Sequence, residues 1–374
     1  MSTTKKSLDI LPRSAWTGDQ NKPILIAGPC SAESEEQVLE TAHAISKIPG
    51  VTAYRAGIWK PRTRPNSFEG IGLQGLKWLK KVKEETGLRT ACEVANANHV
   101  YEALKHGVDI LWIGARTTVN PFTVQEIADA LRGVDVPVLV KNPVNPDLQL
   151  WLGAFERLNQ AGIRQLGAIH RGFSTFENGP YRNLPKWTSL IEFKRLLPEV
   201  PIICDPSHIA GNRELLLPIS QKAIDMALDG LMIETHCNPA VALSDAAQQV
   251  TPAALQELLN SLQYRHEEVE NAPNVEYLEE LRDQLDHLDN ETLEIFGRRA
   301  KISRKIGEYK KANNITILQV KRWDQLLGDR LERARRDGLE EQFVKDLFDV
   351  VHKYSIEMQN KIMNETVEQV PAEK

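Results

Sequence analysis

The first two thirds of the chain alternate short β-branched runs with longer stretches of helical character. Eight such runs lie between residues 23 and 236, and each ends on a charged or metal-binding side chain. The runs are PILIAGPC, TAYRAGIWKPR, RTACEV, ILWIGAR, VPVLVK, QLGAIHR, PIICDPSH and GLMIETH. Eight strands alternating with helices predict an α/β fold, a closed (β/α)8 TIM barrel, whose active site lies at the C-terminal ends of its strands.

The last third of the chain has no strand-like pattern. After the eighth run we expect a loop and a closing barrel helix, followed by a charged segment that contains Pro273 and lacks apolar periodicity. Beyond it only helical periodicity remains, interrupted at Asn313 and Asn314 and at Asp337 and Gly338. The expected helices span residues 275–312, 316–336 and 339–365. We therefore predict a barrel domain over residues 1–263, a linker over 264–274 and an all-α three-helix domain over 275–374.

The composition is that of a globular protein, and it limits the expected partners and cellular compartment. Of the 374 residues, 41% are hydrophobic and 26% are charged, and the net charge of −5 favours neither nucleic acid nor an anionic membrane as a partner. The start of the chain lacks the apolar core of a signal peptide, and no apolar span is long enough to cross a membrane. The four cysteines fall in or just after predicted strands, which suits reduced thiols or a metal ligand better than disulfides. We expect a cytoplasmic protein.

Metal-binding side chains gather at the predicted mouth of the barrel. They are Cys30, His208, Glu234 and Asp245, which follow predicted strands or lie in the loop after the eighth. One thiolate, one imidazole and two carboxylates suit a single divalent ion of Mn, Fe, Co or Zn, and suit Mg or Ca poorly. The alternative is a buried cysteine beside ordinary polar loop residues.

Basic side chains gather at the same predicted mouth. They are Arg55, Lys60, Arg62, Arg116, Lys141 and Arg171. Six cations aimed at one cavity repel one another unless an anion neutralises them, and arginine binds phosphate or carboxylate oxygens in pairs. We therefore predict a substrate with several negative charges, in preference to a structural ion-pair network. Thr63 offers a hydroxyl donor to a phosphate group.

Taken together, these segments resemble the type I-beta 3-deoxy-D-arabino-heptulosonate 7-phosphate synthases over about residues 23–250. The resemblance is carried by KPRT, GAR, VLVK, HRG and CDPSH, and by the LSD that follows the eighth strand. It implies condensation of phosphoenolpyruvate with erythrose 4-phosphate, at the entry to aromatic amino-acid biosynthesis. The nearest alternative is a related barrel synthase that uses arabinose 5-phosphate.

The resemblance implies a role for each candidate residue. The metal ligands would be Cys30, His208, Glu234 and Asp245; phosphoenolpyruvate would be held by Arg55, Lys60, Arg116, Lys141 and Arg171; and erythrose 4-phosphate would be held by Arg62 and Thr63. In this reaction water adds at C2 of phosphoenolpyruvate. Lys141 and Glu93 are the catalytic candidates for holding that water or moving its proton. His170 and Asp205, at the ends of the sixth and seventh strands, are counted with the substrate-binding residues, although a glutamate is expected in the family at position 170.

The C-terminal helices carry a second resemblance. Apolar residues repeat every seven positions at Leu278, Leu285 and Ile306, which is typical of a helix packed against partner helices. Arg299 falls on the same stripe, where a buried charge requires an anionic partner. The segments LEELRDQLDHLDNETLEIFGRRAKISRKIGEYKK, ILQVKRW and HKYSIEMQNKI resemble the all-helical chorismate mutases over about residues 275–363. This resemblance implies rearrangement of chorismate to prephenate without a metal, at a site formed by Arg282, Arg299, Lys310, Gln319, Arg322, Ser355 and Gln359. Among these, Arg299, Lys310 and Gln359 are the catalytic candidates.

The spacing of two arginines bears on the oligomeric state. Arg282 and Arg299 are 17 residues apart on one expected helix, a separation of roughly 25 Å. They cannot both contact one chorismate, so Arg282 either has no role or serves the site of a second subunit. The resemblance favours a homodimer formed through the helical domain, with small-molecule substrates. Because the predicted barrel begins almost at once and leaves no room for a separate N-terminal regulatory domain, we expect a ligand of the mutase domain to tune the synthase. The alternative is a helical domain that serves only dimerisation or regulation.

Overall fold

The computed structural model describes residues 7–18, 23–60, 68–175, 179–265, 272–318 and 320–364. The chain divides into two compact units, Met1–Glu267 and Glu268–Lys374. The first, here called the barrel unit, holds all of the described strands, and the second, the helical unit, holds only helices. No helix in these described ranges is both long enough and apolar enough to cross a membrane.

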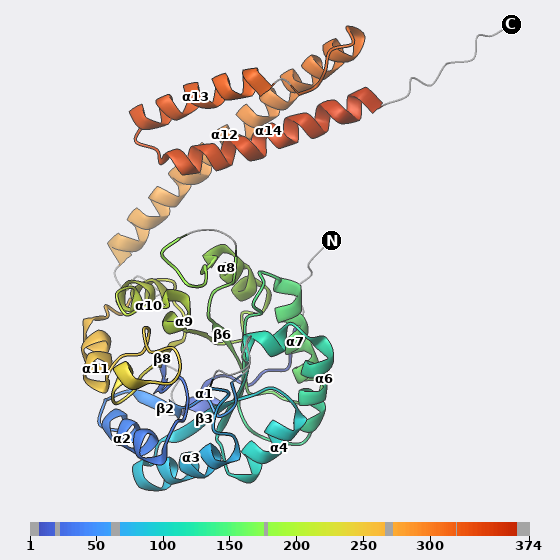
Figure 1. Cartoon of the computed structure of the whole chain (residues 1–374). Coiled ribbons are helices and arrows are strands. Elements are labelled where there is room, and N and C mark those ends of the chain that lie inside the picture. Colours follow the sequence, from blue (N-terminus) through green and yellow to red (C-terminus); the bar gives the residue numbers. More distant parts are fainter. Residues whose placement is uncertain are drawn as a thin grey trace, which may run out of the picture. The chain divides into compact units, whose positions relative to one another are not determined.

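The barrel unit is a closed ring of eight parallel strands in sequence order, which confirms the predicted fold (Figure 1). The strands are β1 (Ile24–Gly28), β2 (Val51–Arg55), β3 (Arg89–Val94), β4 (Ile110–Ile113), β5 (Val138–Lys141), β6 (Leu166–His170), β7 (Ile202–Cys204) and β8 (Gly230–Glu234). Ring closure comes from β1 pairing with β8, with Ile24 opposite Gly230 and Gly28 opposite Glu234. Each predicted apolar run forms one strand, so the reactive residues that end the runs lie at one end of the ring.

Helices surround the ring of strands (Figure 1). The helices of the barrel unit are α1 (Ser14–Thr17), α2 (Glu35–Ile45), α3 (Leu73–Thr86), α4 (Ala97–Lys105), α5 (Ala115–Thr118), α6 (Pro121–Ala130), α7 (Leu148–Gln160), α8 (Trp187–Leu196), α9 (Pro206–Ala210), α10 (Leu216–Asp225), the 3-10 turn η1 (Pro239–Val241) and α11 (Pro252–Ser261). The short helices α1, α5 and α9 were not predicted, because four or five residues are too few for a periodic pattern.

The barrel unit has an inner and an outer apolar core. The inner core consists of side chains that all eight strands send into the ring, including Ile26, Trp112 and Met232. Trp16 of α1 belongs to this cluster, and its carbonyl accepts a hydrogen bond from Arg89 at the start of β3. Trp16 therefore closes the N-terminal end of the ring, which leaves the C-terminal end for a binding site.

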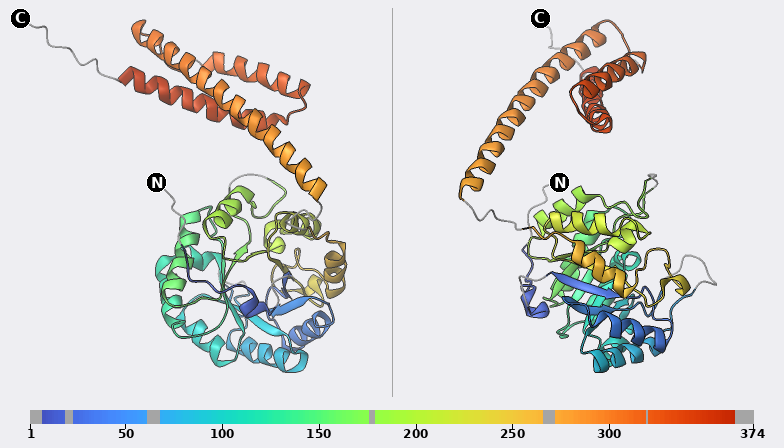
Figure 2. Two further views of the ribbon diagram at one scale, coloured as in Figure 1. Left: turned by 180° about the vertical axis from the view of Figure 1, so that it is seen from behind. Right: turned by 90° about the vertical axis from the view of Figure 1, so that its left-hand side faces the viewer.

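The helical unit consists of three helices, as predicted. They are α12 (Ala272–Ala312), α13 (Val320–Arg336) and α14 (Glu341–Asn364). Figure 2 shows α12 as one unbroken helix, and its first residue lies three positions before the predicted start at 275. The predicted interruptions are confirmed, because Asn314 and Gly338 both adopt positive φ angles, of 53° and 71°, that end a right-handed helix.

Candidate active site

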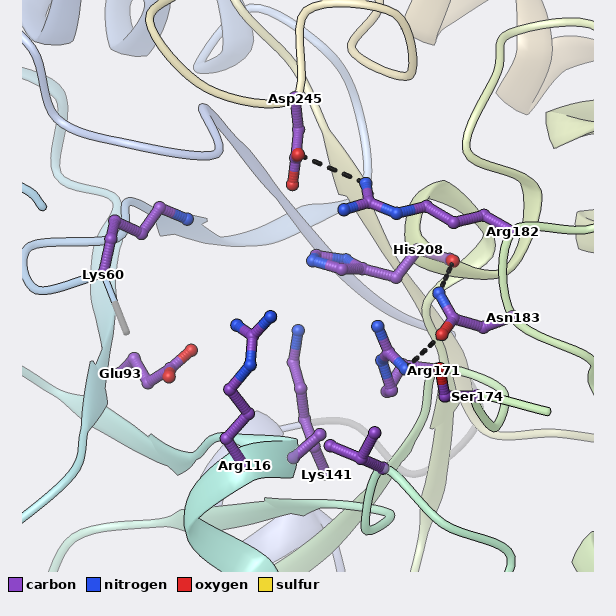
Figure 3. Close-up of a pocket in the computed structure, with 12 residues that line it drawn as sticks. Lys60, Glu93, Arg116, Lys141, Arg171, Ser174, Arg182, Asn183, His208 and Asp245 are labelled. Atoms are coloured by element: carbon purple, nitrogen blue, oxygen red, sulfur yellow. Dashed lines mark hydrogen bonds and ion pairs between the residues drawn. The ribbon is translucent and has the colours of Figure 1, made fainter. Parts of the chain in front are cut away.

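A cavity of about 260 Å³ opens at the C-terminal end of the ring (Figure 3). It is lined by Lys60, Glu93, Ala115, Arg116, Lys141, Val144, Arg171, Ser174, Arg182, Asn183, His208 and Asp245. These residues come from loops and strand ends all around the ring, and most of their side chains are charged. The cavity is suited to a small, multiply charged anion rather than to an apolar ligand.

Four of the predicted cations line this cavity, namely Lys60, Arg116, Lys141 and Arg171. Burial, together with the neighbouring charges of Arg182 and Arg116, lowers the pKa of Arg171 to about 10. Asp205 acts in the opposite direction but does not restore the usual pKa, so the charge of Arg171 is poorly compensated in this cavity. The cation cluster therefore gains stability when an anion binds.

The predicted metal ligands meet beside the cation cluster. One donor atom each from Cys30, Glu234 and Asp245 lie within 4.8 Å of one another. The fourth predicted ligand, His208, places Nε2 3.8 Å from Glu234 Oε1. This oxygen of Glu234 is buried and accepts no hydrogen bond from the described residues. The donor set, with a buried carboxylate oxygen that accepts no hydrogen bond within the described part of the chain, fits a divalent cation of the borderline type.

The ionisation of these ligands also fits a cation. Burial raises the pKa of the Glu234 carboxyl group, but the neighbouring charges of His208 and Arg55 lower it by more. Burial likewise raises the pKa of Asp245, but the charges of His208 and Arg182 lower it by more. Both groups therefore have pKa values below their usual range, and that of Asp245 is about 2. Two ionised carboxylates thus face the place where an ion would be held.

Cys30 behaves differently from the carboxylates. Burial and the charge of Glu234 raise the pKa of its thiol to about 12, although Lys60 acts in the opposite direction. The Nζ of Lys60 donates a hydrogen bond of 2.9 Å to Cys30 Sγ. A metal ion bound at this site would displace the thiol proton, because the thiolate is the ligating form.

Asp205 is fully buried and contacts two residues of the site. It caps helix α9, accepting a hydrogen bond of 3.1 Å from the backbone N–H of His208. Its Oδ2 lies 2.9 Å from Lys141 Nζ and 2.8 Å from His208 Nδ1. Asp205 thereby orients one cation and one metal ligand at once, with the Nε2 of His208 left toward Glu234.

Glu93 lines the cavity at the end of β3. The indole N–H of Trp112 donates a hydrogen bond of 2.9 Å to its Oε2. The backbone of Gly114 lies so close that a methyl group there would overlap the carboxylate. Glu93 is therefore held in one place by a donor on one side and by the surface of a glycine on the other.

Three predicted substrate-binding residues do not line the cavity. Arg55 is buried beneath the metal ligands, with Nη2 3.5 Å from Glu234 Oε1 and its guanidinium over the ring of Trp112. His170 is fully buried, packs near Trp187 and Phe173, and does not reach the cavity. Asp205 is also fully buried and acts on the site through its neighbours, as described above. Arg62 and Thr63 lie outside the described residues.

Three polar lining residues were missed by the sequence analysis, namely Ser174, Arg182 and Asn183. All three come from the segment between β6 and α8. Asn183 accepts a hydrogen bond of 2.7 Å from Arg171 and donates one of 2.6 Å to the His208 carbonyl, and Arg182 lies 3.2 Å from Asp245 (Figure 3). The available signal was the length of this segment, because long connections in a barrel commonly carry function.

The helical unit joins polar groups of α12 and α14. Arg299 donates a hydrogen bond of 2.7 Å to Ser355 Oγ, and Gln359 lies 3.4 Å from Ser303 Oγ. Ser303, Ser355 and Gln359 are all buried, which is unusual for polar side chains in a unit of this size. Arg299 and Ser303 are four positions apart on α12, and so are Ser355 and Gln359 on α14. The two residues of each helix therefore lie on one side of it, and these two sides face each other.

The structure describes the side chains of only two of the other four residues predicted for this site, namely Lys310 and Arg282. Lys310 is buried, which lowers its pKa, and its Nζ donates to the Ile317 carbonyl at 2.6 Å. Arg282 is exposed and pairs with Glu279 on its own helix. Gln319 and the side chain of Arg322 lie outside what the structure describes.

Comparison with known proteins agrees with this geometry. Residues 3–271 match the model of the DAHP synthetase I family, and residues 281–360 match that of chorismate mutase type II. A phospho-2-dehydro-3-deoxyheptonate aldolase from Thermotoga maritima is 33% identical over 238 residues, or 64% of this chain and 68% of that protein. The crystal structure of a DAHP synthase from Thermotoga maritima aligns with a TM-score of 0.58 and 32% identity, covering 64% of this chain and 68% of that one.

A second group of relatives is also similar to the barrel. A 2-dehydro-3-deoxyphosphooctonate aldolase from Desulfotalea psychrophila is 30% identical over 260 residues, which cover 64% of this chain and 88% of that protein. The family match nevertheless spans most of the chain and includes every strand of the barrel. The chain therefore belongs to the DAHP synthetase I family and, with a chorismate mutase type II domain at its C-terminus, is a bifunctional enzyme.

Proposed function

We propose that the barrel unit condenses phosphoenolpyruvate with erythrose 4-phosphate, giving 3-deoxy-D-arabino-heptulosonate 7-phosphate and inorganic phosphate, with the help of a divalent ion. The observation that carries this proposal is one cavity in which four cations lie beside a cluster of metal-binding side chains. Both substrates carry phosphate, and phosphoenolpyruvate adds a carboxylate. The helical unit is proposed to convert chorismate to prephenate.

The residues of the cavity divide the work of the condensation. Arg116, Lys141 and Arg171 bind the phosphate and carboxylate of phosphoenolpyruvate, and so hold its C3 toward the aldehyde. The chemistry that a bound divalent ion supplies is Lewis-acid polarisation of the aldehyde oxygen. Lys141 and Glu93 hold the water that adds at C2 and move its proton. The cations then stabilise the charge on the departing phosphate.

A related reaction with arabinose 5-phosphate is the second candidate, since the 2-dehydro-3-deoxyphosphooctonate aldolases are also similar to the barrel. The family match and the mutase domain favour the four-carbon sugar, because both activities then serve one pathway. Steady-state rates with the two sugars, measured on one preparation, separate these candidates. A higher kcat/KM with arabinose 5-phosphate would overturn our choice.

Metal dependence is tested by two assays on the same purified protein, before and after chelation. Phosphate release from phosphoenolpyruvate with erythrose 4-phosphate should be lost after chelation and return with Mn²⁺, Co²⁺ or Zn²⁺. Chorismate consumption should persist in both states, which makes it the internal control for an intact protein. Undiminished phosphate release after complete removal of metal would contradict the proposal.

The mutase proposal rests on the buried polar face between α12 and α14. Arg299 is held by Ser355 in a position to bind a carboxylate, and Lys310 and Gln359 supply donors for the ether oxygen of chorismate. Arg299→Ala should abolish chorismate turnover and leave phosphate release unchanged. A wild-type protein without chorismate turnover would instead make the helical unit a scaffold.

We further propose that the helical unit forms a homodimer through α12. The apolar residues on and beside the seven-residue stripe of α12 are exposed, including Leu285 at 61%, Ile295 at 54% and Ile302 at 60% of their surface. Such a stripe along one helix is typical of a surface that packs against another helix. In such a dimer, each subunit would also bring its Arg282 to the mutase site of the other.

Light scattering during size-exclusion chromatography tests the dimer. Leu285→Glu combined with Ile302→Glu should give a monomer and reduce mutase activity. The matched control is Leu217→Glu, which changes an exposed leucine of the barrel unit. A wild-type monomer with full mutase activity would contradict the proposal. Two further predictions of the sequence, regulation of the synthase by a mutase ligand and residence in the cytoplasm, remain open to experiment.

A further inference from the structure

Two adjacent glutamines lie behind the metal ligands and were not singled out by the sequence analysis. Gln248 and Gln249 follow the loop that carries Asp245, and their exposed fractions are only 1% and 0%. A glutamine amide has two donor hydrogens and an acceptor oxygen, so a buried one must find several partners. The partners of these two residues are therefore informative.

Gln248 contacts both carboxylates of the metal-binding cluster. Its Nε2 donates a hydrogen bond of 2.6 Å to Glu234 Oε2 and lies 3.5 Å from Asp245 Oδ2. Its Oε1 accepts a hydrogen bond of 2.8 Å from Arg182. Because a guanidinium can only donate, the amide oxygen must face Arg182 and the amide hydrogens must face the carboxylates. The orientation of Gln248 is thus determined by its surroundings.

Gln249 connects the third donor to the same loop. Its Oε1 accepts a hydrogen bond of 2.9 Å from the backbone N–H of Cys30, and its Nε2 donates one of 2.8 Å to the Ser244 carbonyl. Cys30 follows β1, whereas Ser244 immediately precedes Asp245. Gln249 therefore joins two segments that are more than 200 positions apart in the sequence, and each segment brings one donor.

The loop held in this way carries a residue in an unfavourable backbone conformation. Asp245 has a φ angle of 47°, in the left-handed region that non-glycine residues seldom adopt. Its carboxylate also faces that of Glu234, and like charges repel. The hydrogen bonds from Gln248 and the ion pair with Arg182 at 3.2 Å (Figure 3) offset both costs before any ion binds.

We propose that Gln248 and Gln249 are positioning residues that hold Cys30, Glu234 and Asp245 in the arrangement that accepts a divalent ion. This inference rests on the proposed metal dependence of the barrel. It assigns no ligand role to either glutamine, since the amide of each is already engaged with protein groups. Residues that orient metal ligands in this way commonly change affinity by about 10- to 100-fold when they are replaced.

The test is ion affinity, measured on the full-length protein. Gln248→Met keeps the length of the side chain and removes the amide, and Gln165→Met is the control, because Gln165 is bonded to Asp135 before β6, at the opposite end of the ring. We expect Gln248→Met to weaken Mn²⁺ binding by about 10- to 100-fold in calorimetric titrations, and the control to bind like wild type. Gln248→Asn, whose amide is one methylene too short, should weaken binding similarly, which keeps the test valid if the methionine variant folds poorly.

A spectroscopic measurement separates positioning from general stability. The absorption of bound Co²⁺ reports the arrangement of its ligands, so we expect altered bands in Gln248→Met and Gln249→Met at saturating Co²⁺. All spectra are taken well below the thermal midpoint of each variant, so that a loss of stability alone leaves the bands unchanged. Wild-type affinity and an unaltered spectrum in these variants would overturn this inference alone. A wild-type protein that binds none of the divalent ions would overturn the proposed metal dependence, and this inference with it.

Discussion

The close approach of Gly114 to Glu93 leads to a prediction about catalysis in the barrel. A Cβ atom at position 114 would lie 2.2 Å from Glu93 Oε1, so the carboxylate must withdraw by about 1.2 Å to reach an ordinary contact of 3.4 Å. The backbone of Gly114, with φ −71° and ψ 157°, suits any residue. Gly114→Ala therefore acts on the enzyme only through the position of Glu93.

The size of the effect follows from what holds Glu93. Its Oε2 accepts a hydrogen bond of 2.9 Å from Trp112 Nε1, and a shift of this size stretches or breaks that bond. A hydrogen bond to a charged group contributes about 1.5–3 kcal/mol, and a catalytic group displaced by about 1 Å can lose about 100-fold in rate. We expect Gly114→Ala to lower kcat for phosphate release by about 10- to 100-fold, with little change in KM for phosphoenolpyruvate.

A double-mutant cycle tests this explanation. In a Glu93→Ala background no carboxylate is left to displace, so adding Gly114→Ala should cost nothing further. The control is Gly153→Ala in α7, where the new methyl group meets no atom within 4 Å, and there we expect wild-type turnover. Normal kcat in Gly114→Ala, or the same loss with and without Glu93, would refute the reasoning.

Three further predictions address other parts of the molecule. Ser355→Ala removes the hydrogen bond that orients Arg299, so kcat/KM for chorismate should fall about tenfold in a spectrophotometric assay while phosphate release stays constant. Burial lowers the pKa of His170 to about 3, below its value near 6.5 in an unfolded chain, so the barrel loses stability as the pH falls below about 6.5. The loss between pH 7.5 and 5.5, measured by urea unfolding, should shrink by about 1.4 kcal/mol in His170→Leu. Asp205→Asn leaves the buried ammonium of Lys141 without its carboxylate, and should lower the free energy of unfolding of the barrel by about 3 kcal/mol; unchanged stability would contradict the ion pair.

Much of the site was predictable because barrel geometry turns sequence position into spatial position. Residues that end parallel strands must meet at one end of the ring, so the order of the strands was enough to place Cys30, Lys141 and Glu234 together. Strand order alone does not decide which of them faces the cavity. Arg55 ends β2 like the others, yet its side chain turns beneath the metal ligands because Glu234 and the ring of Trp112 receive its charge there.

The sequence by itself determined the eight strands, the three C-terminal helices and the residue types at the strand ends, because each depends on local periodicity. Only the tertiary structure decided the contacts made by long loops, such as Arg182 with Asp245 and Gln248 with Glu234. A loop has no period that fixes the direction of its side chains, so its contacts depend on how the whole ring closes. Distances and burial, which set charge and affinity at the site, follow from that closure alone.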